Sequence, residues 1–260
     1  MRRRRIDTLL TERGLAGSRT SAAASVRAGR VRIGGDGLRA AKPGQLVPDD
    51  AALEVEESPR YVSRGGLKLE HALDALEIEV GGRSCLDVGA STGGFTDCLL
   101  QRGAERVIAL DVGHGQLDWG LRSDPRVHAI ERENARELAS TDLPYRPELA
   151  TIDVSFISLA KVLPAVAACL VPAGELLALV KPQFELGRGR VRGGVVRSAD
   201  ERRETLVSVA EAAMGIGLAF KGFASSGLSG LKGNRETFVW CGLEGPGERD
   251  VESAAREVER

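Results

Sequence analysis

Two lysines and two carboxylates in this 260-residue chain could together remove a proton from a weakly acidic hydroxyl group. Asp153 and Lys181 each follow an apolar run typical of a buried strand, and parallel strands end at one edge of a sheet. Lys68 lies on a predicted helix, and Glu236 precedes an apolar run that, if antiparallel, would begin at that same edge. A lysine can act as a base when burial or a neighbouring ammonium lowers its pKa. The competing interpretation is two structural salt bridges.

The elements that would position these groups are organised around one stretch, Cys85-Leu-Asp-Val-Gly-Ala-Ser-Thr-Gly-Gly-Phe-Thr-Asp97. Its pattern predicts a buried strand, a glycine-rich turn and a helix over about 94–102. A second apolar run, 107–112, carries Asp111 near its end, where a carboxylate can bind a ribose. This order is typical of a nucleoside-binding βαβ unit. The alternative is an ordinary strand, turn and helix of an α/β protein.

The glycine-rich turn differs from a dinucleotide-binding turn. Ser91 occupies the position of the second glycine, which would let the backbone approach a pyrophosphate. Asp87, two residues before Gly89, would repel a pyrophosphate but suits a ligand that carries an ammonium and a sulfonium. The predicted cofactor is therefore S-adenosylmethionine. The residues expected to bind it are Asp87, Gly89, Ser91, Gly93, Gly94, Phe95, Asp111 and, after a predicted third strand, Asn134.

The rest of the chain after residue 60 alternates between strand and helix patterns. Strands are predicted at 127–130, 149–154 and 175–180, and near 220–223 and 237–240. Helices are predicted to open at 113–117 and to cover 158–169 and 200–214. Such alternation predicts an α/β domain with a doubly wound, mostly parallel sheet that binds ligands at the carboxyl ends of its strands.

The N-terminal region has a different charge from the rest of the chain. Residues 1–42 hold eleven Arg and Lys against three acids, whereas the remainder holds 25 basic and 34 acidic residues. Spacing and capping predict two short helices, starting near Arg5 and Ser18, and a hairpin over 31–37. This module would bind RNA by charge and shape, unless it is only a solvated basic face. The expected phosphate contacts are Arg5, Arg19, Arg27, Arg30 and Arg32, with Arg188 and Arg190 of a Gly/Arg loop at 183–198.

Several classes of protein are disfavoured by composition. No apolar run reaches the roughly 20 residues that span a bilayer, and the start lacks the pattern of a signal peptide. The four cysteines show no C-x-x-C spacing, so neither a zinc site nor a disulfide framework is predicted. We therefore expect a cytoplasmic protein that has reduced thiols, binds no metal and does not associate with membranes.

Two further absences bear on the acceptor atom. Amino-methylating enzymes usually carry Asn/Asp-Pro-Pro-Tyr/Phe after the fourth strand, where this chain has Asp153-Val-Ser-Phe156. A pyrimidine C5 methylase needs a nucleophilic cysteine, typically after a proline, and none of the four cysteines follows one. Oxygen is therefore the favoured acceptor.

Short motifs link both parts of the chain to known families. Over about residues 4–58, the chain resembles the RNA-binding domain named after small-subunit ribosomal protein S-four, through Arg5-Ile-Asp-x-x-Leu10, Ser18-Arg-x-x-Ala22 and Gly29-x-Val-x-Ile33. Nearly the whole chain resembles the TlyA (haemolysin A-like) rRNA methyltransferases. The motifs are Val62-Ser-Arg-Gly-Gly-Leu-Lys-Leu69, Asp87-Val-Gly-Ala-Ser-Thr-Gly-Gly-Phe-Thr96, Leu110-Asp-Val-Gly-His-Gly-Gln-Leu117, Asp153-Val-Ser-Phe-Ile-Ser158, Leu179-Val-Lys-Pro-Gln-Phe-Glu185 and Gly233-Asn-Arg-Glu236.

The second resemblance implies a Rossmann-like class I methyltransferase domain of the FtsJ type, with a mostly parallel seven-stranded sheet, beside a small α+β RNA-binding domain. The implied divisions are an RNA-binding domain at 1–58, a linker at 59–63, the methyltransferase domain at 64–246 and a C-terminal helix or tail at 247–260. The implied activity is 2′-O-methylation of cytidine in 16S and 23S rRNA of assembled ribosomal subunits.

The family's K-D-K-E tetrad falls on Lys68, Asp153, Lys181 and Glu236. We take Lys181 as the base, Asp153 and Glu236 as its tuning groups, and Lys68 as the group that positions the hydroxyl. Rival interpretations are a non-catalytic RNA-binding protein built on a Rossmann scaffold and, less favoured, a haemolysin.

Two details of the resemblance concern the N-terminal part. The family's Arg-x-Trp linker reads Arg60-Tyr-Val62 here, so Tyr61 or Val62 must replace the tryptophan. The segment 2–10 resembles the longer N-terminal helix of family members that modify both subunits.

Overall fold

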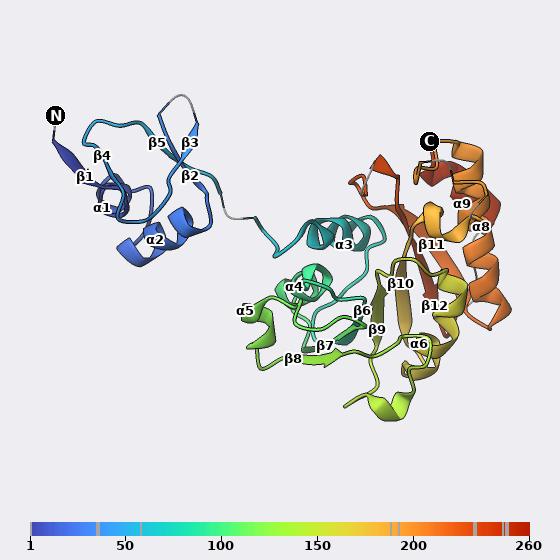
Figure 1. Cartoon of the computed structure of the whole chain (residues 1–260). Coiled ribbons are helices and arrows are strands. Elements are labelled where there is room, and N and C mark those ends of the chain that lie inside the picture. The colour runs from blue at the N-terminus through green and yellow to red at the C-terminus, as the bar shows by residue number, and fades with distance from the viewer. Residues whose placement is uncertain are drawn as a thin grey trace. The chain divides into compact units, whose positions relative to one another are not determined.

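The computed structural model describes residues 2–34, 37–57, 59–187, 189–191, 193–230, 233–245, 247 and 250–260. The chain divides into two compact units, Met1–Pro59 and Arg60–Arg260, called here the small and the large unit (Figure 1). Each has its own apolar core.

The small unit packs two helices against short strands. Ile6, Leu9 and Leu10 have helical spacing and are buried, as are Val26 and Val31. The elements are β1 (Arg3–Arg5), α1 (Ile6–Glu12), α2 (Arg19–Arg27), β2 (Val31–Ile33), β3 (Leu38–Arg39), β4 (Leu46–Pro48) and β5 (Leu53–Val55). Strand β1 pairs with β4, and β2 lies between β3 and β5, all antiparallel.

One N-terminal expectation is wrong. The start of the chain does not form a long helix, because residues 3–5 are extended and pair with β4. The helix α1 that follows is only seven residues long. Backbone pairing with a neighbouring strand, which cannot be read from local spacing, decides the conformation of this segment.

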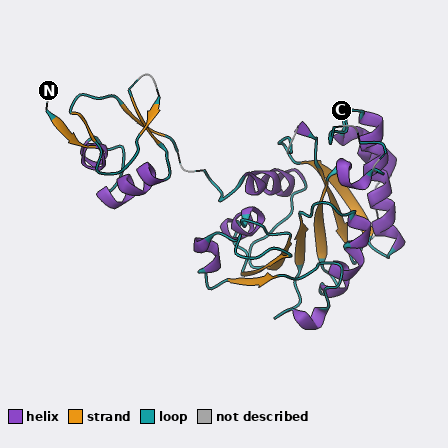
Figure 2. Cartoon of the chain, viewed as in Figure 1, coloured by secondary structure: helices purple, strands orange, loops and turns teal. Residues whose placement is uncertain are grey.

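The large unit is a seven-stranded sheet with helices on both faces (Figures 1 and 2). Its first half comprises α3 (Arg64–Ala75), β6 (Ser84–Val88), α4 (Gly94–Gln101), β7 (Arg106–Asp111), α5 (Trp119–Arg122), β8 (Val127–Glu131), η1 (Ser140–Asp142) and β9 (Leu149–Ile152). Its second half comprises η2 (Leu159–Lys161), α6 (Leu163–Cys169), β10 (Glu175–Val180), α7 (Pro182–Glu185), α8 (Ala199–Gly215), β11 (Ala219–Ser225), β12 (Thr237–Gly242) and α9 (Val251–Val258).

The strand order is β11-β12-β10-β9-β6-β7-β8, and only β12 runs antiparallel to its neighbours. The predicted α/β fold with a mostly parallel seven-stranded sheet is thereby confirmed. Helices α3, α4 and α5 cover one face of the sheet, and α6, α8 and α9 cover the other (Figure 1). The central strands are apolar on both sides for this reason.

The sheet register brings the predicted catalytic residues to one edge. Asp153 and Lys181 directly follow β9 and β10, which are parallel. Val180 lies opposite Thr237 in the antiparallel β10–β12 pair, so Glu236 enters the sheet where Lys181 leaves it. The condition placed on the last strand, that it run antiparallel, is met. We call this the carboxyl edge and the opposite one the amino edge.

Two helix predictions need correction. The helix predicted to open at 113–117 begins at Trp119, capped by Asp118, whose carboxylate accepts a hydrogen bond from the Gly120 N–H at 2.8 Å. The helix predicted over 158–169 is divided into η2 and α6. Pro164 lies at the start of α6, where its missing N–H costs no hydrogen bond, rather than inside a bent helix.

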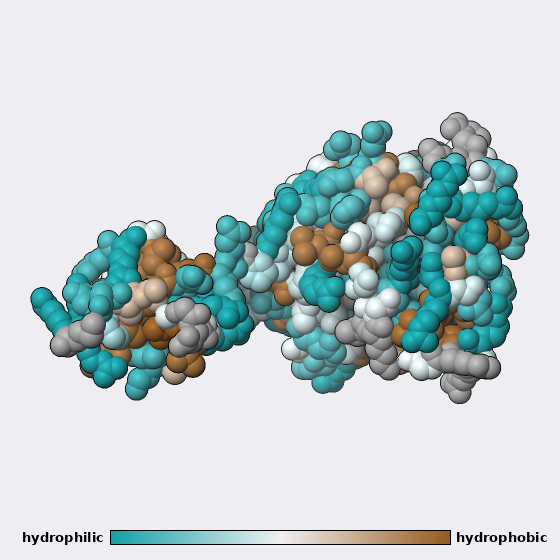
Figure 3. Space-filling view, turned by 90° about the horizontal axis from the view of Figure 1, so that it is seen from above, coloured by the Kyte–Doolittle hydropathy of each residue, from teal (hydrophilic) through white to brown (hydrophobic). Residues whose placement is uncertain are grey.

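Hydrophilic side chains cover most of the face seen in Figure 3, with smaller apolar groups between them. Among the described residues, none of the helices has the length and apolar character needed to cross a bilayer. The same residues contain no His, Cys, Asp and Glu cluster suited to a metal ion.

Candidate active site

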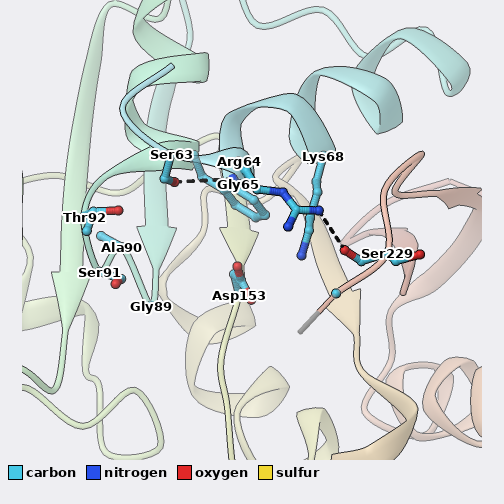
Figure 4. Close-up of a pocket in the computed structure, with 13 residues that line it drawn as sticks. Ser63, Arg64, Gly65, Lys68, Gly89, Ala90, Ser91, Thr92, Asp153 and Ser229 are labelled. Atoms are coloured by element: carbon cyan, nitrogen blue, oxygen red, sulfur yellow. Dashed lines mark hydrogen bonds between the residues drawn. The ribbon is translucent and has the colours of Figure 1, made fainter. Parts of the chain in front are cut away.

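A cavity of about 220 Å³ opens at the carboxyl edge of the large unit. Its walls come from the N-terminal turn of α3, the glycine turn 89–92 and the segment 229–230. Figure 4 shows the turn on one side, Lys68 and Ser229 on the other, and Asp153 between them. Segments far apart in the sequence therefore share one pocket.

The four predicted catalytic residues form two ion pairs at this cavity. Lys68 Nζ lies 2.5 Å from Glu236 Oε2, and Lys181 Nζ pairs with Asp153 Oδ1. Lys181 also donates a hydrogen bond to Ser155 Oγ at 3.1 Å. Lys68 and Asp153 line the cavity, and each contacts its partner, Glu236 or Lys181, directly. Both lysine side chains are 13% exposed, which leaves little solvent to screen either pair.

Two glycines make this arrangement sterically possible. A Cβ on Gly230 would lie 2.0 Å from Glu236 Oε1, so a larger residue there would displace the carboxylate. A Cβ on Gly89 would lie 2.3 Å from the Asp153 carbonyl oxygen, and Gly89 also has a φ of +85°. The Asp153 N–H donates in turn to the Val88 carbonyl. The glycine turn and the loop that carries Asp153 are thus in direct backbone contact.

The predicted cofactor residues separate into those that line the cavity and those that support it. Gly89, Ser91, Gly94 and Phe95 line it. Gly93 does not, and its φ of +96° and close approach to Leu121 instead fix the start of α4.

Asp87 is placed differently from the prediction. Its side chain is fully buried, and Oδ2 accepts hydrogen bonds from Thr96 N (2.8 Å) and Thr96 Oγ1 (2.7 Å). Burial raises the pKa of this carboxyl to about 7, and the Thr96 hydrogen bonds oppose the rise. This geometry does not support a direct contact with a ligand ammonium. Asp87 instead ties the strand β6 to the first turn of α4.

Asp111 holds the far end of the glycine turn. Its Oδ2 accepts from Ser91 N at 2.8 Å and its Oδ1 accepts from Gly113 N at 2.6 Å. Asn134 lies two residues beyond Arg132, whose N–H donates to the Gly113 carbonyl, so it follows the same corner. Neither Asp111 nor Asn134 lines the 220 Å³ cavity, which they adjoin through the Ser91 turn.

Comparison with known proteins assigns the family. Residues 61–243 match the family described as FtsJ-like methyltransferase. The chain belongs to the FtsJ-like methyltransferase family. It is 50% identical over 242 residues to the 16S/23S rRNA (cytidine-2'-O)-methyltransferase TlyA of Mycobacterium tuberculosis, which covers 92% of this chain and 90% of that protein.

Two further relatives extend the similarity to the whole chain. A candidate rRNA methyltransferase, YqxC of Bacillus subtilis, is 43% identical and covers 100% of this chain and 92% of its own. The solved structure of a candidate hemolysin from Streptococcus thermophilus has a TM-score of 0.76 and 42% identity, and covers 100% of this chain and 95% of that chain. The predicted TlyA-type resemblance is confirmed.

An FtsJ-like methyltransferase needs room for an adenosine beside its glycine turn, and one residue that fits was missed in the sequence. Val112 follows Asp111 and is 73% exposed, although its side chain is apolar. An exposed apolar group directly after a strand-end carboxylate suits the flat face of a nucleobase. The signal available in the sequence was an apolar residue placed directly after the strand-end acid.

Phe156 is a second residue that spacing did not single out. It lies in the loop after Asp153, is 91% exposed and has a φ of +65°. A bulky residue in this conformation carries strain of about 1–3 kcal/mol. Its ring packs on Phe184, with centroids 4.9 Å apart. A solvent-facing aromatic ring beside the Lys181–Asp153 pair is suited to stacking on an exposed base.

The two linker residues that could replace the family's tryptophan, Tyr61 and Val62, differ in burial. Tyr61 is buried, a Cβ on Gly66 would overlap its ring, and its hydroxyl donates to Glu70 Oε1 at 3.0 Å. Val62 is 41% exposed. Tyr61 is therefore an aromatic anchor on α3, and its replacement of the tryptophan of Arg-x-Trp stays a prediction.

The predicted RNA-binding arginines of the small unit are mostly paired within it. Arg5 and Arg19 lie 2.6 and 3.4 Å from the same oxygen of Asp7, and the Arg5 hydrogen bond lowers the pKa of that carboxyl to about 2. Arg32 lies 2.6 Å from Glu56 Oε1.

The two remaining arginines of that group differ from each other. Arg30 donates a hydrogen bond to Ser25 Oγ at 3.2 Å. Arg27 is exposed and has no partner in the part of the chain that the structure describes.

Of the two predicted arginines of the 183–198 loop, the structure describes Arg190. Arg190 makes two hydrogen bonds to Glu204, at 2.6 and 2.7 Å, and lies 3.6 Å from Glu201. Arg188 lies outside the described residues. The same loop is fixed to the site by Asn234, which bonds both Val196 N and the Gly194 carbonyl.

Proposed function

We propose that this protein transfers a methyl group from S-adenosylmethionine to the ribose 2′-hydroxyl of a cytidine in 16S or 23S rRNA, or in both, within assembled ribosomal subunits. The observation that carries the proposal is the meeting of the Lys68–Glu236 and Lys181–Asp153 pairs at one cavity beside a nucleoside-binding turn. The similarity to TlyA of M. tuberculosis, a 16S/23S rRNA (cytidine-2'-O)-methyltransferase, supports the choice of substrate.

The residues at the cavity have separate tasks in this proposal. Lys181 Nζ accepts the proton of the 2′-hydroxyl, while Asp153 and Ser155 fix that nitrogen in place. Lys68 Nζ, locked to Glu236, orients the hydroxyl oxygen.

The groups around the cavity fit S-adenosylmethionine, which when bound supplies an electrophilic methyl group. Asp111 would hold the ribose hydroxyls with its remaining lone pairs, since each oxygen already accepts one backbone hydrogen bond. Val112 would contact the adenine face and Asn134 its edge. The backbone of Gly89 and Ser91 would face the methionine portion.

RNA recognition in this proposal combines charge and stacking. The small unit would act as an S-four-type RNA-binding domain through its exposed arginines. Phe156 would stack on a base next to the methylated ribose. The protein would then act in the cytoplasm, where ribosomal subunits are assembled.

The test is transfer of tritiated methyl from S-adenosylmethionine to purified small and large ribosomal subunits that lack the modification. We expect incorporation into rRNA that Lys181→Ala reduces by about 10³-fold. Lys221→Ala is the matched control, because Lys221 pairs with Glu175 at 2.6 Å but at the amino edge. It should retain activity.

Absence of incorporation by the wild-type protein into either subunit would contradict the proposal. A non-catalytic RNA-binding scaffold would then be the better account.

A further inference from the structure

We propose that Glu185 is a positioning residue whose carboxylate holds the loop 153–159 in the conformation that keeps Asp153 against Lys181. The inference rests on the proposed function for its catalytic consequence. Its structural half can be tested without any enzymatic assay.

Glu185 bridges the two catalytic loops. It lies at the end of α7, the short helix that begins directly after Lys181. Its Oε2 accepts a hydrogen bond from Ser158 Oγ at 2.6 Å, and its Oε1 accepts one from Leu159 N at 2.8 Å. The carboxylate therefore fixes the far end of the loop that starts at Asp153.

Without Glu185, the loop would be fixed mainly near its beginning and middle. Lys181 forms an ion pair with Asp153 and donates a hydrogen bond to Ser155, and Phe156 packs on Phe184. Phe156 has a φ of +65°, a conformation that persists only where the surroundings enforce it. Fixing both ends of the loop, at Asp153 and at residues 158–159, is a way of enforcing it.

The partial burial of Glu185 also supports a positioning role for its carboxylate. Burial raises its pKa, and the hydrogen bonds from Ser158 and Leu159 oppose the rise. Among the described residues it forms no ion pair, so its charge is balanced by a hydroxyl and a backbone N–H alone. Burying a carboxylate is unfavourable, and the hydrogen bonds of this one go to the loop 153–159. A role in positioning that loop accounts for its presence there.

The chain offers a matched control at the amino edge. Glu148 Oε2 accepts from Ser84 N at 2.8 Å and from Ser84 Oγ at 2.9 Å, so it too is bonded to a backbone N–H and a serine hydroxyl. It supports the start of β6, far along the strands from Lys181. Removing it tests what the loss of such a carboxylate does when no catalytic loop is involved.

The structural experiment is hydrogen exchange of the Leu159 amide in the full-length protein. We expect faster exchange in Glu185→Ala than in wild type, and wild-type exchange in Glu185→Gln, whose amide oxygen still accepts from Leu159 N. Glu148→Ala should leave Leu159 unchanged. Equal exchange in wild type and Glu185→Ala would overturn the proposal, whatever the enzymatic activity.

The catalytic experiment measures methyl transfer and binding of S-adenosylmethionine for the same variants. We expect Glu185→Ala to lower kcat by about 10–100-fold while Kd for the cofactor stays within about threefold, because the reacting groups are misplaced rather than the cofactor. Glu185→Gln should recover most of kcat, and Glu148→Ala should keep it. An active wild type with kcat unchanged in Glu185→Ala would refute the positioning role alone, whereas an inactive wild type would refute the proposed function alone.

Discussion

The two edges of the large unit's sheet contain the same kind of ion pair in different surroundings. At the amino edge, Glu175 lies 2.8 Å from Arg83 and 2.6 Å from Lys221, so one carboxylate neutralises two cations. At the carboxyl edge, Lys181–Asp153 and Lys68–Glu236 each hold one lysine and one carboxylate beside an open cavity.

Ion pairing alone therefore does not tell a structural site from a chemical one. The pairs at the carboxyl edge differ in what surrounds them: a cavity, glycines at 89 and 230 that bring backbone close, and loops rather than strand interiors. The competing interpretation of Lys68, Asp153, Lys181 and Glu236, two structural salt bridges, predicts that these pairs behave like those of Glu175 at the amino edge.

The largest effect is expected from two substitutions, one at each edge, that each replace a carboxylate with an uncharged amide of the same size. Asp153→Asn should lower kcat for methyl transfer by about 10³-fold with little loss of stability, because it removes the group that fixes Lys181. Glu175→Gln should leave kcat of the folded enzyme unchanged but cost about 2 kcal/mol, since two cations lose their partner. Steady-state kinetics and denaturant unfolding check both, and a similar kcat for the two variants would erase the distinction.

A steric change at the carboxyl edge tests the same comparison between the two edges. Gly230→Ala places a Cβ 2.0 Å from Glu236 Oε1 and should lower kcat by about 10–100-fold by displacing the partner of Lys68. Gly81→Ala is the control, because a Cβ there meets no atom within 4 Å. Kinetics of both variants decide the matter, and equal activity would show that Glu236 tolerates displacement.

The next prediction concerns Asp87, a buried carboxylate that accepts hydrogen bonds from Thr96 and forms no ion pair among the described residues. Its folded pKa, about 7, lies above the ordinary value of 3.8, so the folded state holds more protons between these values and loses stability as pH rises through them. Asp87→Asn removes this dependence. The stability of the variant relative to wild type should therefore grow from pH 4 to pH 7, by on the order of 2–4 kcal/mol. Thermal unfolding across this range measures the difference, and a constant difference would contradict the assignment.

The smallest effect concerns the small unit. Arg27 has no partner among the described residues, whereas Arg32 is paired with Glu56. Arg27→Ala should weaken RNA binding severalfold, because one contact to a phosphate is lost. The slope of log K against log salt concentration should become shallower by about 0.7–0.9, the amount expected for one charge. Arg32→Ala should change the slope less. Binding titrations at several salt concentrations compare them.

Much of the large unit could be predicted because its signals are local. Apolar runs that end in Asp111, Asp153 and Lys181 identify strand ends, and strand ends of a parallel sheet share an edge. The direction of the last strand is only a condition of that reasoning, and the antiparallel β10–β12 pair meets it, which brings Glu236 to the same edge.

What escaped prediction depends on contacts between distant segments. Asp87 faces Thr96 rather than the cavity, and Phe156 takes a left-handed conformation that no propensity favours. Arg5 and Arg19 converge on Asp7 from two different elements. These placements are set by packing, for which spacing along the chain holds no signal.

The backbone contact between Gly89 and the Asp153 carbonyl links two functions that a designer would wish to vary separately. In the proposed mechanism, a side chain added at position 89 to alter cofactor preference would also displace Asp153, the proposed partner of the base. A change at residue 89 would therefore alter both properties together. In the same proposal Val112 could be varied alone, because it is exposed and has no such contact with the loop 153–159 among the described residues.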